Sequence, residues 1–296
     1  MNYYNEIKQK LIDNEIYMKV KDYSKERNRV ITYFEIGKLL NEAGSVYGEN
    51  IIGKYSEKLM VEVGKKYNYR TMYRMRKLYQ VFSNEKLTPL VSKLSWSHYL
   101  ILLPIKNINQ IIYYVNQTVD RKLSKRQLEE IIKNKEYERL PEETKNKLID
   151  HEDNRVIDYI KNPIIIRNPN NLEVIKEKAL QKLILEDLDN FLKELGNSFC
   201  YIGNEYKIKI GNNYNYIDLL LYNIEFNCYA VVELKITELK KEHIGQIEVY
   251  MNYIDNNLKR INQDKTIGII ICKKDNKFIM EYCSDTRILT KEYSVI

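Results

Sequence analysis

The spacing of apolar residues changes partway along this 296-residue chain, and that change most limits the folds open to it. Between Ile7 and Leu40, apolar side chains recur mostly every three to five positions, which is typical of helices packed on one face, and helical segments are expected up to about residue 135. Beyond residue 199 they form short runs rich in β-branched and aromatic residues, separated by turn residues, which predicts strands. Neither a helical bundle nor an all-β domain accounts for both patterns. We therefore expect an α+β chain of two domains, which also fits the length.

The first pattern predicts an all-helical domain over residues 1–140. Helices in the first forty residues are expected to end at a glycine-containing loop over 41–48. Ser124 followed by Gln127 predicts a capping box at the start of a later helix. Further helices are expected at about 49–63, 69–81, 94–103, 107–116 and 124–135.

The second pattern predicts an α/β core over residues 171–296. Residues 141–170 are expected to be a linker, because they hold three of the five prolines and dense charge. Helices are expected at 172–195, 240–260 and 278–282, and strands at 199–202, 206–210, 214–222, 228–234 and 266–272. Three or four antiparallel strands followed by a helix and a further strand predict a mixed β-sheet flanked by helices.

The excess positive charge lies entirely in the first half of the chain. The chain has 48 basic and 41 acidic residues, a net charge of +7. Residues 1–150 hold 28 basic and 19 acidic residues, and the remainder holds 20 and 22. This asymmetry favours a polyanion-binding half joined to a half with another task. The alternative is a basic surface that is only solvated.

Several classes of protein are not supported by the sequence. No run of 18 apolar residues predicts a membrane span, and the polar start lacks the apolar segment of a secretory signal. The four cysteines lie far apart without a CxxC pair, so we expect a reduced, cytoplasmic protein without a structural zinc site. No phosphate-binding glycine motif or nucleophile elbow occurs.

Charged residues at the end of an apolar strand indicate a site. Glu233 and Lys235 close the run that begins at Ala230 and, by strand alternation, point the same way. The turn between the two strands can bring Asp218 beside Glu233. Two carboxylates at one sheet end repel each other unless a cation lies between them, and Mg²⁺, or Mn²⁺, prefers such oxygen ligands. We expect Asp218, Glu233 and the carbonyl of Leu234 to hold the metal.

Three further residues have predicted catalytic roles beside these carboxylates. The Lys235 ammonium can steady a hydroxide nucleophile and the charge of a phosphorane-like transition state. Gln246 and Tyr250 are four residues apart and share one helix face, from which they could hydrogen-bond water, Lys235 or a phosphate.

These residues resemble the PD-(D/E)XK nuclease superfamily, and the chain as a whole resembles the bacterial DUF1016, or YhcG-like, family. In this family a helical, DNA-binding-like domain precedes a restriction-endonuclease-like nuclease core. The matching segments are Tyr33–Gly37, Tyr47–Gly48, Leu94–His98, Leu123–Ser124, Phe191–Gly196, Ile217–Leu220, Glu233–Lys235 and Gly245–Gln246.

The chain departs from the family pattern at two positions. The family often carries an acidic residue on the first helix of the nuclease core, where this chain has Gln181, with Glu177 and Glu186 as nearby substitutes. Where the family tends to have Gln, this chain has Glu205, which could supply an extra carboxylate or pair with a lysine.

The break at residues 64–68 between two predicted helices of the basic half has helix-turn-helix character, with 69–81 as the candidate recognition helix. Tyr73 flanks its basic face and could contact a sugar or base, whereas Tyr79 is expected to pack toward the core. The alternative is a solvated face or a module for protein interaction. The predicted DNA-binding residues are Lys65, Lys66, Arg70, Arg74, Arg76 and Lys77.

Together, the residues and the resemblance predict a Mg²⁺-dependent DNA endonuclease that docks its substrate through the helical domain. The alternative is a non-catalytic DNA-binding or assembly module of a restriction, defence or mobile-element system that keeps the nuclease fold. The charge pattern does not separate DNA from RNA. A homodimer is plausible because cutting two strands needs two sites.

Overall fold

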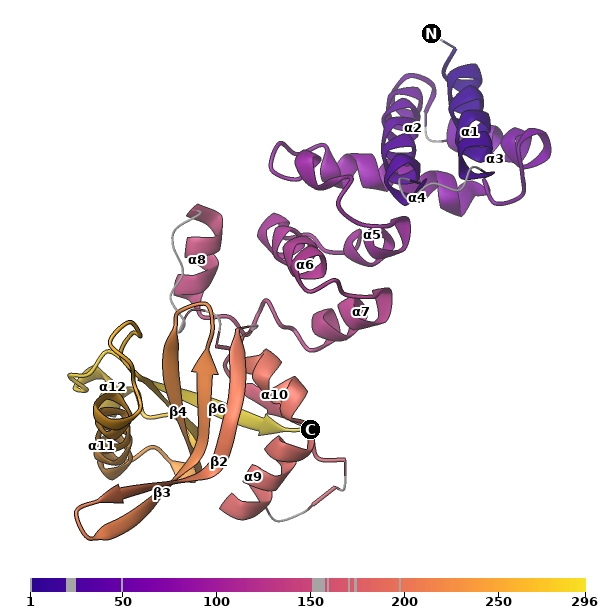
Figure 1. Cartoon of the computed structure of the whole chain (residues 1–296). Helices are drawn as coiled ribbons and strands as arrows, with labels where there is room; N and C mark the ends of the chain where they lie inside the picture. The colour runs from indigo at the N-terminus through magenta and orange to yellow at the C-terminus, as the bar shows by residue number, and fades with distance from the viewer. Residues whose placement is uncertain are drawn as a thin grey trace. The chain divides into compact units, whose positions relative to one another are not determined.

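A computed structural model of the chain describes residues 2–19, 25–48, 50–150, 158, 160–169, 171–172, 175–196 and 198–296. The chain divides into two compact units, Met1–Tyr137 and Glu138–Ile296 (Figure 1). None of the described helices combines the length and hydropathy that a bilayer span requires.

The first unit is all-helical, as the sequence predicts. Its last helix begins with the predicted capping box, because Gln127 N donates to Ser124 Oγ at 3.4 Å and Ser124 N donates to Gln127 Oε1 at 2.8 Å. The helices are α1 (Tyr3–Lys19), α2 (Lys25–Tyr47), α3 (Asn50–Glu62), α4 (Tyr69–Phe82), α5 (Trp96–Leu102), α6 (Ile108–Asp120) and α7 (Lys125–Lys133), with a 3-10 turn at Thr88–Leu90.

The predicted loop over 41–48 is wrong, because α2 runs on to Tyr47. Gly44 lies inside this helix, and a Cβ there would be 3.3 Å from the Arg76 guanidinium of α4. Arg76 is only 9% exposed, and its Nε donates to Asn41 Oδ1 at 3.3 Å. The glycine therefore makes room for a buried arginine and does not mark a turn.

A second glycine on α2 lets α2 and α4 pack backbone against backbone. A Cβ on Gly37 would lie 2.2 Å from the main-chain oxygen of Met75, closer than any side chain allows. Leu40 of α2 and Met72 of α4 are both fully buried.

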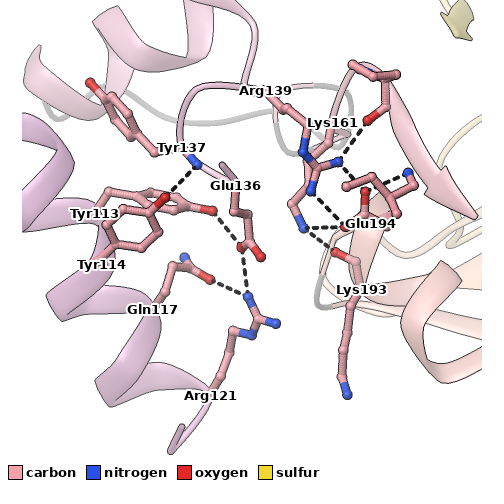
Figure 2. Close-up of polar contacts among 12 residues, drawn as sticks. Tyr113, Tyr114, Gln117, Arg121, Glu136, Tyr137, Arg139, Lys161, Lys193 and Glu194 are labelled. Atoms are coloured by element: carbon pink, nitrogen blue, oxygen red, sulfur yellow. Dashed lines mark hydrogen bonds and ion pairs between the residues drawn. The ribbon is translucent and has the colours of Figure 1, made fainter. Parts of the chain in front are cut away.

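The end of the first unit is fixed by a buried carboxylate. Glu136, 4% exposed, accepts hydrogen bonds from Tyr113 OH and Arg121 Nη1, each at 2.8 Å (Figure 2). The N–H of Tyr137 donates to Tyr114 OH at 3.3 Å. A buried acid needs such partners, so this cluster ties the segment after α7 to α6.

The second unit contains a mixed six-stranded sheet in the order β1-β6-β5-β4-β3-β2. Strands β1, β6, β5 and β4 run parallel, and β4, β3 and β2 are antiparallel. The strands are β1 (Ile164–Ile166), β2 (Phe199–Ile210), β3 (Asn213–Asn223), β4 (Cys228–Glu238), β5 (Ile267–Lys274) and β6 (Ile288–Val295). The helices of this unit are α8 (Glu142–Asp150), α9 (Glu177–Glu186), α10 (Leu188–Leu195), α11 (Lys241–Asn257) and α12 (Lys277–Glu281).

Helices cover both faces of this sheet, as predicted (Figure 1). On one face Leu183 of α9 and Phe191 of α10 pack with Val232 and other strand residues in one buried cluster. On the other face Ile247 and Met251 of α11 belong to a second cluster. The resulting three-layer core places the charged end of β4 between two packed layers.

Several predicted boundaries differ from the structure. The two strands expected at 199–202 and 206–210 are one strand, β2, with a register shift after Tyr201. The single helix expected over 172–195 is two helices, which meet at Asp187, and residues 173–174 lie outside the described residues. β1 and β6 have no counterpart in the sequence prediction; β1 has only three residues, all isoleucine, and most of β6 is half-buried, so neither gives the signal of a full strand.

The segment 141–170, expected as a linker, contains α8 and the edge strand β1. Residues 151–157, 159 and 170 of this segment lie outside the described residues.

Close to its start, the second unit is tied to α10 by Glu194. Arg139 Nη2 donates to Glu194 Oε1 at 3.0 Å, and Lys161 Nζ lies 3.8 Å from the same oxygen (Figure 2). Ile165 N of β1 donates to Glu194 Oε2 at 3.0 Å. Burial alone would raise the pKa of Glu194, but the Arg139 hydrogen bond and the Lys161 charge hold it below its usual value.

Candidate active site

The candidate site lies where β4 leaves the core. Residues 230–234 of β4 are all buried, including Glu233, which is 2% exposed. Lys235 is half-buried, and the strand becomes exposed at Thr237. An ionisable group buried in an otherwise apolar strand is costly unless other groups satisfy it, so its surroundings decide what it does.

The structure brings Asp218 beside Glu233, as expected from the hairpin. The β3–β4 ladder ends at the pair Leu219 and Val232, so the next residues along the two strands are Asp218 and Glu233. The N–H of Leu234 donates to Asp218 Oδ2 at 2.7 Å. This hydrogen bond fixes the Asp218 carboxylate against the end of β4.

Lys235 bridges two carboxylates from different elements. Its Nζ lies 3.1 Å from Glu233 Oε2 and 3.5 Å from Glu177 Oε1 of α9. Burial would lower the pKa of Lys235, but the charges of Glu233, Glu177 and Asp218 raise it above its usual value. The side chain therefore stays an ammonium at neutral pH.

Both central carboxyls hold their protons more tightly than usual. Burial, then the nearby charge of Asp218, raises the pKa of Glu233 to about 7 despite the opposing Lys235. Burial also raises the pKa of Asp218, and Glu177 and Glu205 add to this effect, against the Leu234 hydrogen bond and Lys235. Burial and the closeness of the two carboxyls therefore both disfavour the doubly ionised pair.

One oxygen of this pair has no partner. Glu233 Oε1 is buried and accepts no hydrogen bond. An unsatisfied buried oxygen beside a second carboxylate suits a hard divalent cation, which binds oxygen ligands. Among the described residues no group of three or more His, Cys, Asp or Glu side chains could hold a metal ion. Mg²⁺ commonly uses only one or two carboxylates, with water and substrate oxygens completing its shell, so the residues present fit it.

Gln246 and Tyr250 lie on α11 and contact each other. Gln246 Nε2 donates to Tyr250 OH at 3.1 Å, and the Tyr250 side chain is buried in the core on that face of the sheet. Within the described part of the chain, no hydrogen bond joins either residue to Asp218, Glu233 or Lys235.

Gln181 and Glu205, the two departures from the family pattern, lie in different surroundings. Gln181 of α9 donates through Nε2 to the main-chain oxygen of Asp218 at 3.1 Å, so it supports β3 at the site. Glu177 reaches Lys235, whereas Glu186 lies 3.7 Å from Lys182 on the exposed side of α9. Glu205 is exposed and has a positive φ of 45°.

His243 has a local role at the start of α11. Its Nδ1 accepts a hydrogen bond from the N–H of Lys240 at 3.2 Å. Burial, then the charge of Lys235, lowers the pKa of His243, so it is mainly neutral at pH 7. The signal for this role in the sequence is its position three residues after Lys240, at the start of the helix.

Of the cations predicted to bind DNA, Lys65, Lys66 and Arg70 are exposed. Arg70 is exposed, and Arg74 and Lys77 follow at helical spacing on α4, half-buried. Tyr69 and Tyr73 stack with ring centroids 6.3 Å apart. Lys65 and Lys66 are exposed in the turn before α4, and Lys66 pairs with Glu15 at 2.5 Å.

Two neighbouring residues on α4 face the core. Arg76, which the sequence placed with the DNA-binding cations, is buried against Gly44 and Asn41, so we assign it to helix packing. Tyr79 packs on Phe34, with ring centroids 5.3 Å apart, as expected.

Comparison with known families assigns both units. Residues 157–295 match the family model of the YhcG PDDEXK nuclease domain, and residues 11–139 match that of the DUF1016 N-terminal domain. The second unit is thus a nuclease-type domain of the PD-(D/E)XK class. The chain belongs to the DUF1016, or YhcG-like, family, which confirms the resemblance seen in the sequence.

The individual proteins that the chain resembles share 25% of its residues or fewer. The chain is 25% identical over 290 residues to an Escherichia coli (strain K12) protein named "Putative nuclease YhcG", covering 81% of this chain and 76% of that protein. A repair endonuclease from Pyrococcus abyssi matches at 15% identity and a TM-score of 0.29, over 43% of this chain and 49% of its own. The structure of the EndoMS–dsDNA2 complex matches at 17% identity and a TM-score of 0.29. The match covers 44% of this chain and 48% of the other. This chain therefore spans about half of each of these two solved structures.

Proposed function

We propose that the protein is a divalent-cation-dependent nuclease that hydrolyses phosphodiester bonds in DNA. The observation that carries this proposal is the buried Glu233, whose Oε1 has no partner although Asp218 and Lys235 lie beside it. A structural acid in a core is normally satisfied by hydrogen bonds, as Glu136 and Glu194 are in this chain.

Asp218 and Glu233 would hold the cation, Mg²⁺ or Mn²⁺, with the Leu234 carbonyl as a further oxygen ligand. Such a cation lowers the pKa of its water and offsets charge on the reacting phosphate. The N–H of Leu234 orients Asp218, and Gln181 supports β3 from the main-chain side. These contacts hold the carboxylates in place before substrate arrives.

Lys235 would stabilise charge in the transition state. Its ammonium is half-buried beside Glu233, where a fixed positive charge acts more strongly than it does in water. Gln246 and Tyr250 would orient water or a phosphate oxygen from α11. Arg70, Arg74 and Lys77 of α4 would bind the DNA backbone from the first unit.

The test is a cleavage assay on linear, nicked and branched labelled DNA with Mg²⁺, Mn²⁺ or EDTA. We expect cleavage that needs the metal and is lost in Glu233→Ala, whereas Glu248→Ala, an exposed α11 carboxyl, cleaves normally. Unchanged cleavage by Glu233→Ala would refute the site. Binding without cleavage under every metal would favour the non-catalytic module.

A further inference from the structure

The hairpin of β2 and β3 extends past the rest of the sheet. β3 pairs with β4 only from Leu219 to Asn223, but it pairs with β2 as far as Asn213, at the hairpin turn. Gly211 in that turn has a φ of +60°, which favours glycine. Residues 206–217 therefore form a two-stranded ribbon that begins directly before Asp218.

One face of this ribbon is anchored to the domain. Ile208 of β2 and Ile217 of β3 are 1% and 0% exposed and belong to the same buried cluster as Ile247 of α11. Tyr206, the register partner of Ile217, packs against the same cluster. The ribbon is therefore held on the body of the domain and is not a free arm.

The opposite face carries two lysines and two tyrosines, all exposed. Lys207 is the register partner of Tyr216, and Lys209 is the partner of Tyr214, so all four side chains point away from the buried isoleucines. Lys207 Nζ lies 3.8 Å from the centre of the Tyr214 ring. Tyr214 and Tyr216 are 57% and 52% exposed, which is high for large aromatic side chains.

The charge of the ribbon contrasts with that of its surroundings. Residues 151–296 hold 20 basic and 22 acidic residues, but the twelve residues from 206 to 217 hold two lysines and no acid. No ion pair within the described residues engages either lysine. Unpaired cations next to exposed aromatic rings suit a polyanion with sugar and base surfaces.

We propose that this face of the ribbon, Lys207, Lys209, Tyr214 and Tyr216, is a second DNA-binding surface that holds duplex DNA beside Asp218. The lysines contact phosphates, and the tyrosines contact sugars or donate to phosphate oxygens. A two-stranded ribbon also has the width that the major groove admits. The proposal rests on the proposed function, since it deepens the account of how DNA reaches the carboxylates.

The test is DNA binding by the full chain carrying Glu233→Gln, so that binding is read without cleavage. Fluorescence anisotropy of a labelled duplex is measured at several salt concentrations for Lys207→Ala/Lys209→Ala. The matched control is Arg260→Ala/Lys265→Ala, which removes two exposed cations at the other end of the sheet. Circular dichroism confirms that each variant is folded.

We expect the lysine variant to bind about ten-fold more weakly. The salt slope of its log affinity should be smaller by about 1.8, since each phosphate that a lysine neutralises adds about 0.9 to the slope. The control variant should keep the DNA affinity and the salt slope of the parent chain. Tyr214→Ala/Tyr216→Ala should weaken binding without changing the slope, because no cation is removed. A lysine variant that behaves as the control would overturn the proposal.

Two further outcomes keep this proposal separate from the nuclease proposal. If Lys207→Ala/Lys209→Ala lost affinity for an RNA duplex but kept full affinity for duplex DNA, the assignment of the ribbon to DNA would be overturned. If the wild-type chain cleaves nothing but the lysine variant still loses DNA affinity, the nuclease proposal fails and the ribbon proposal stands.

Discussion

The helical unit and the sheet unit use charged side chains in opposite ways. On α4 the cations that face outward, with Arg70 as the most exposed, lie on a solvated helix surface. At the end of β4, Glu233 is buried, lies 3.1 Å from Lys235 Nζ and has its pKa raised in part by the charge of Asp218. Exposed charges add small, screened increments, whereas buried charges act as a unit. We therefore expect graded losses from changes in the first unit and near-complete losses from changes in the second.

The largest effect expected after loss of Glu233 itself is that of Lys235→Met. Methionine keeps most of the aliphatic stem but removes the ammonium, so the cleavage rate should fall by about 10²–10³, as for loss of one preorganised donor. Single-turnover cleavage at saturating DNA measures this. Lys265→Met, an exposed lysine before β5, is the control and should cleave normally. A rate within about three-fold of wild type would remove Lys235 from the proposed chemistry.

A smaller and salt-dependent effect is expected from Arg70→Ala/Arg74→Ala/Lys77→Ala. Removing three cations that bind phosphates should reduce DNA affinity by about 10- to 100-fold near physiological salt and lower the salt slope by about 2.7. The cleavage rate at saturating DNA should be kept. The control removes Lys86, Lys93 and Lys106, three exposed lysines elsewhere in the same unit. Equal losses in both variants would show that α4 is an ordinary solvated face.

The smallest effect concerns stability and pH. Because the pKa of Glu233 is raised to about 7 from its usual 4.5, the folded chain binds this proton more tightly than the unfolded chain does. The resulting contribution to the free energy of unfolding is fully present below pH 4.5 and is lost as the pH rises through 7. In EDTA the unfolding free energy of wild type should fall between pH 5 and pH 8, relative to Glu233→Gln, by up to about 3 kcal/mol.

Urea unfolding at the two pH values measures this difference. Mg²⁺ at pH 8 should restore stability to wild type and not to Glu233→Gln, because the cation offsets the same charge. Parallel pH profiles of the two proteins in EDTA would contradict the burial argument for Glu233.

The meeting of Asp218 and Glu233 could be predicted from the sequence, because a hairpin joins two adjacent strands and its turn residues are recognisable. The burial of Glu233 followed from its apolar neighbours in β4. The overall order of a helical unit and a mixed sheet was likewise visible in the apolar spacing. These features depend on short segments and their direct neighbours.

Features that depend on distant segments were not predictable. Arg76 lies off the face shared by Arg70, Arg74 and Lys77, but its buried partners Gly44 and Asn41 lie on α2, more than thirty residues earlier in the chain. The contact of Gln181 with the Asp218 carbonyl joins residues 37 apart. β6 was not predicted because its half-buried residues become a strand only by pairing with β5 and β1.

The most direct test of the central claim is metal binding by the full chain. Titration with Mn²⁺, followed by the loss of the free-ion electron paramagnetic resonance signal, measures binding without substrate. The account predicts one site in wild type and in Glu248→Gln that is lost in Glu233→Gln and in Asp218→Asn. Equal Mn²⁺ binding in all four proteins, or none in wild type at millimolar Mn²⁺, would contradict it.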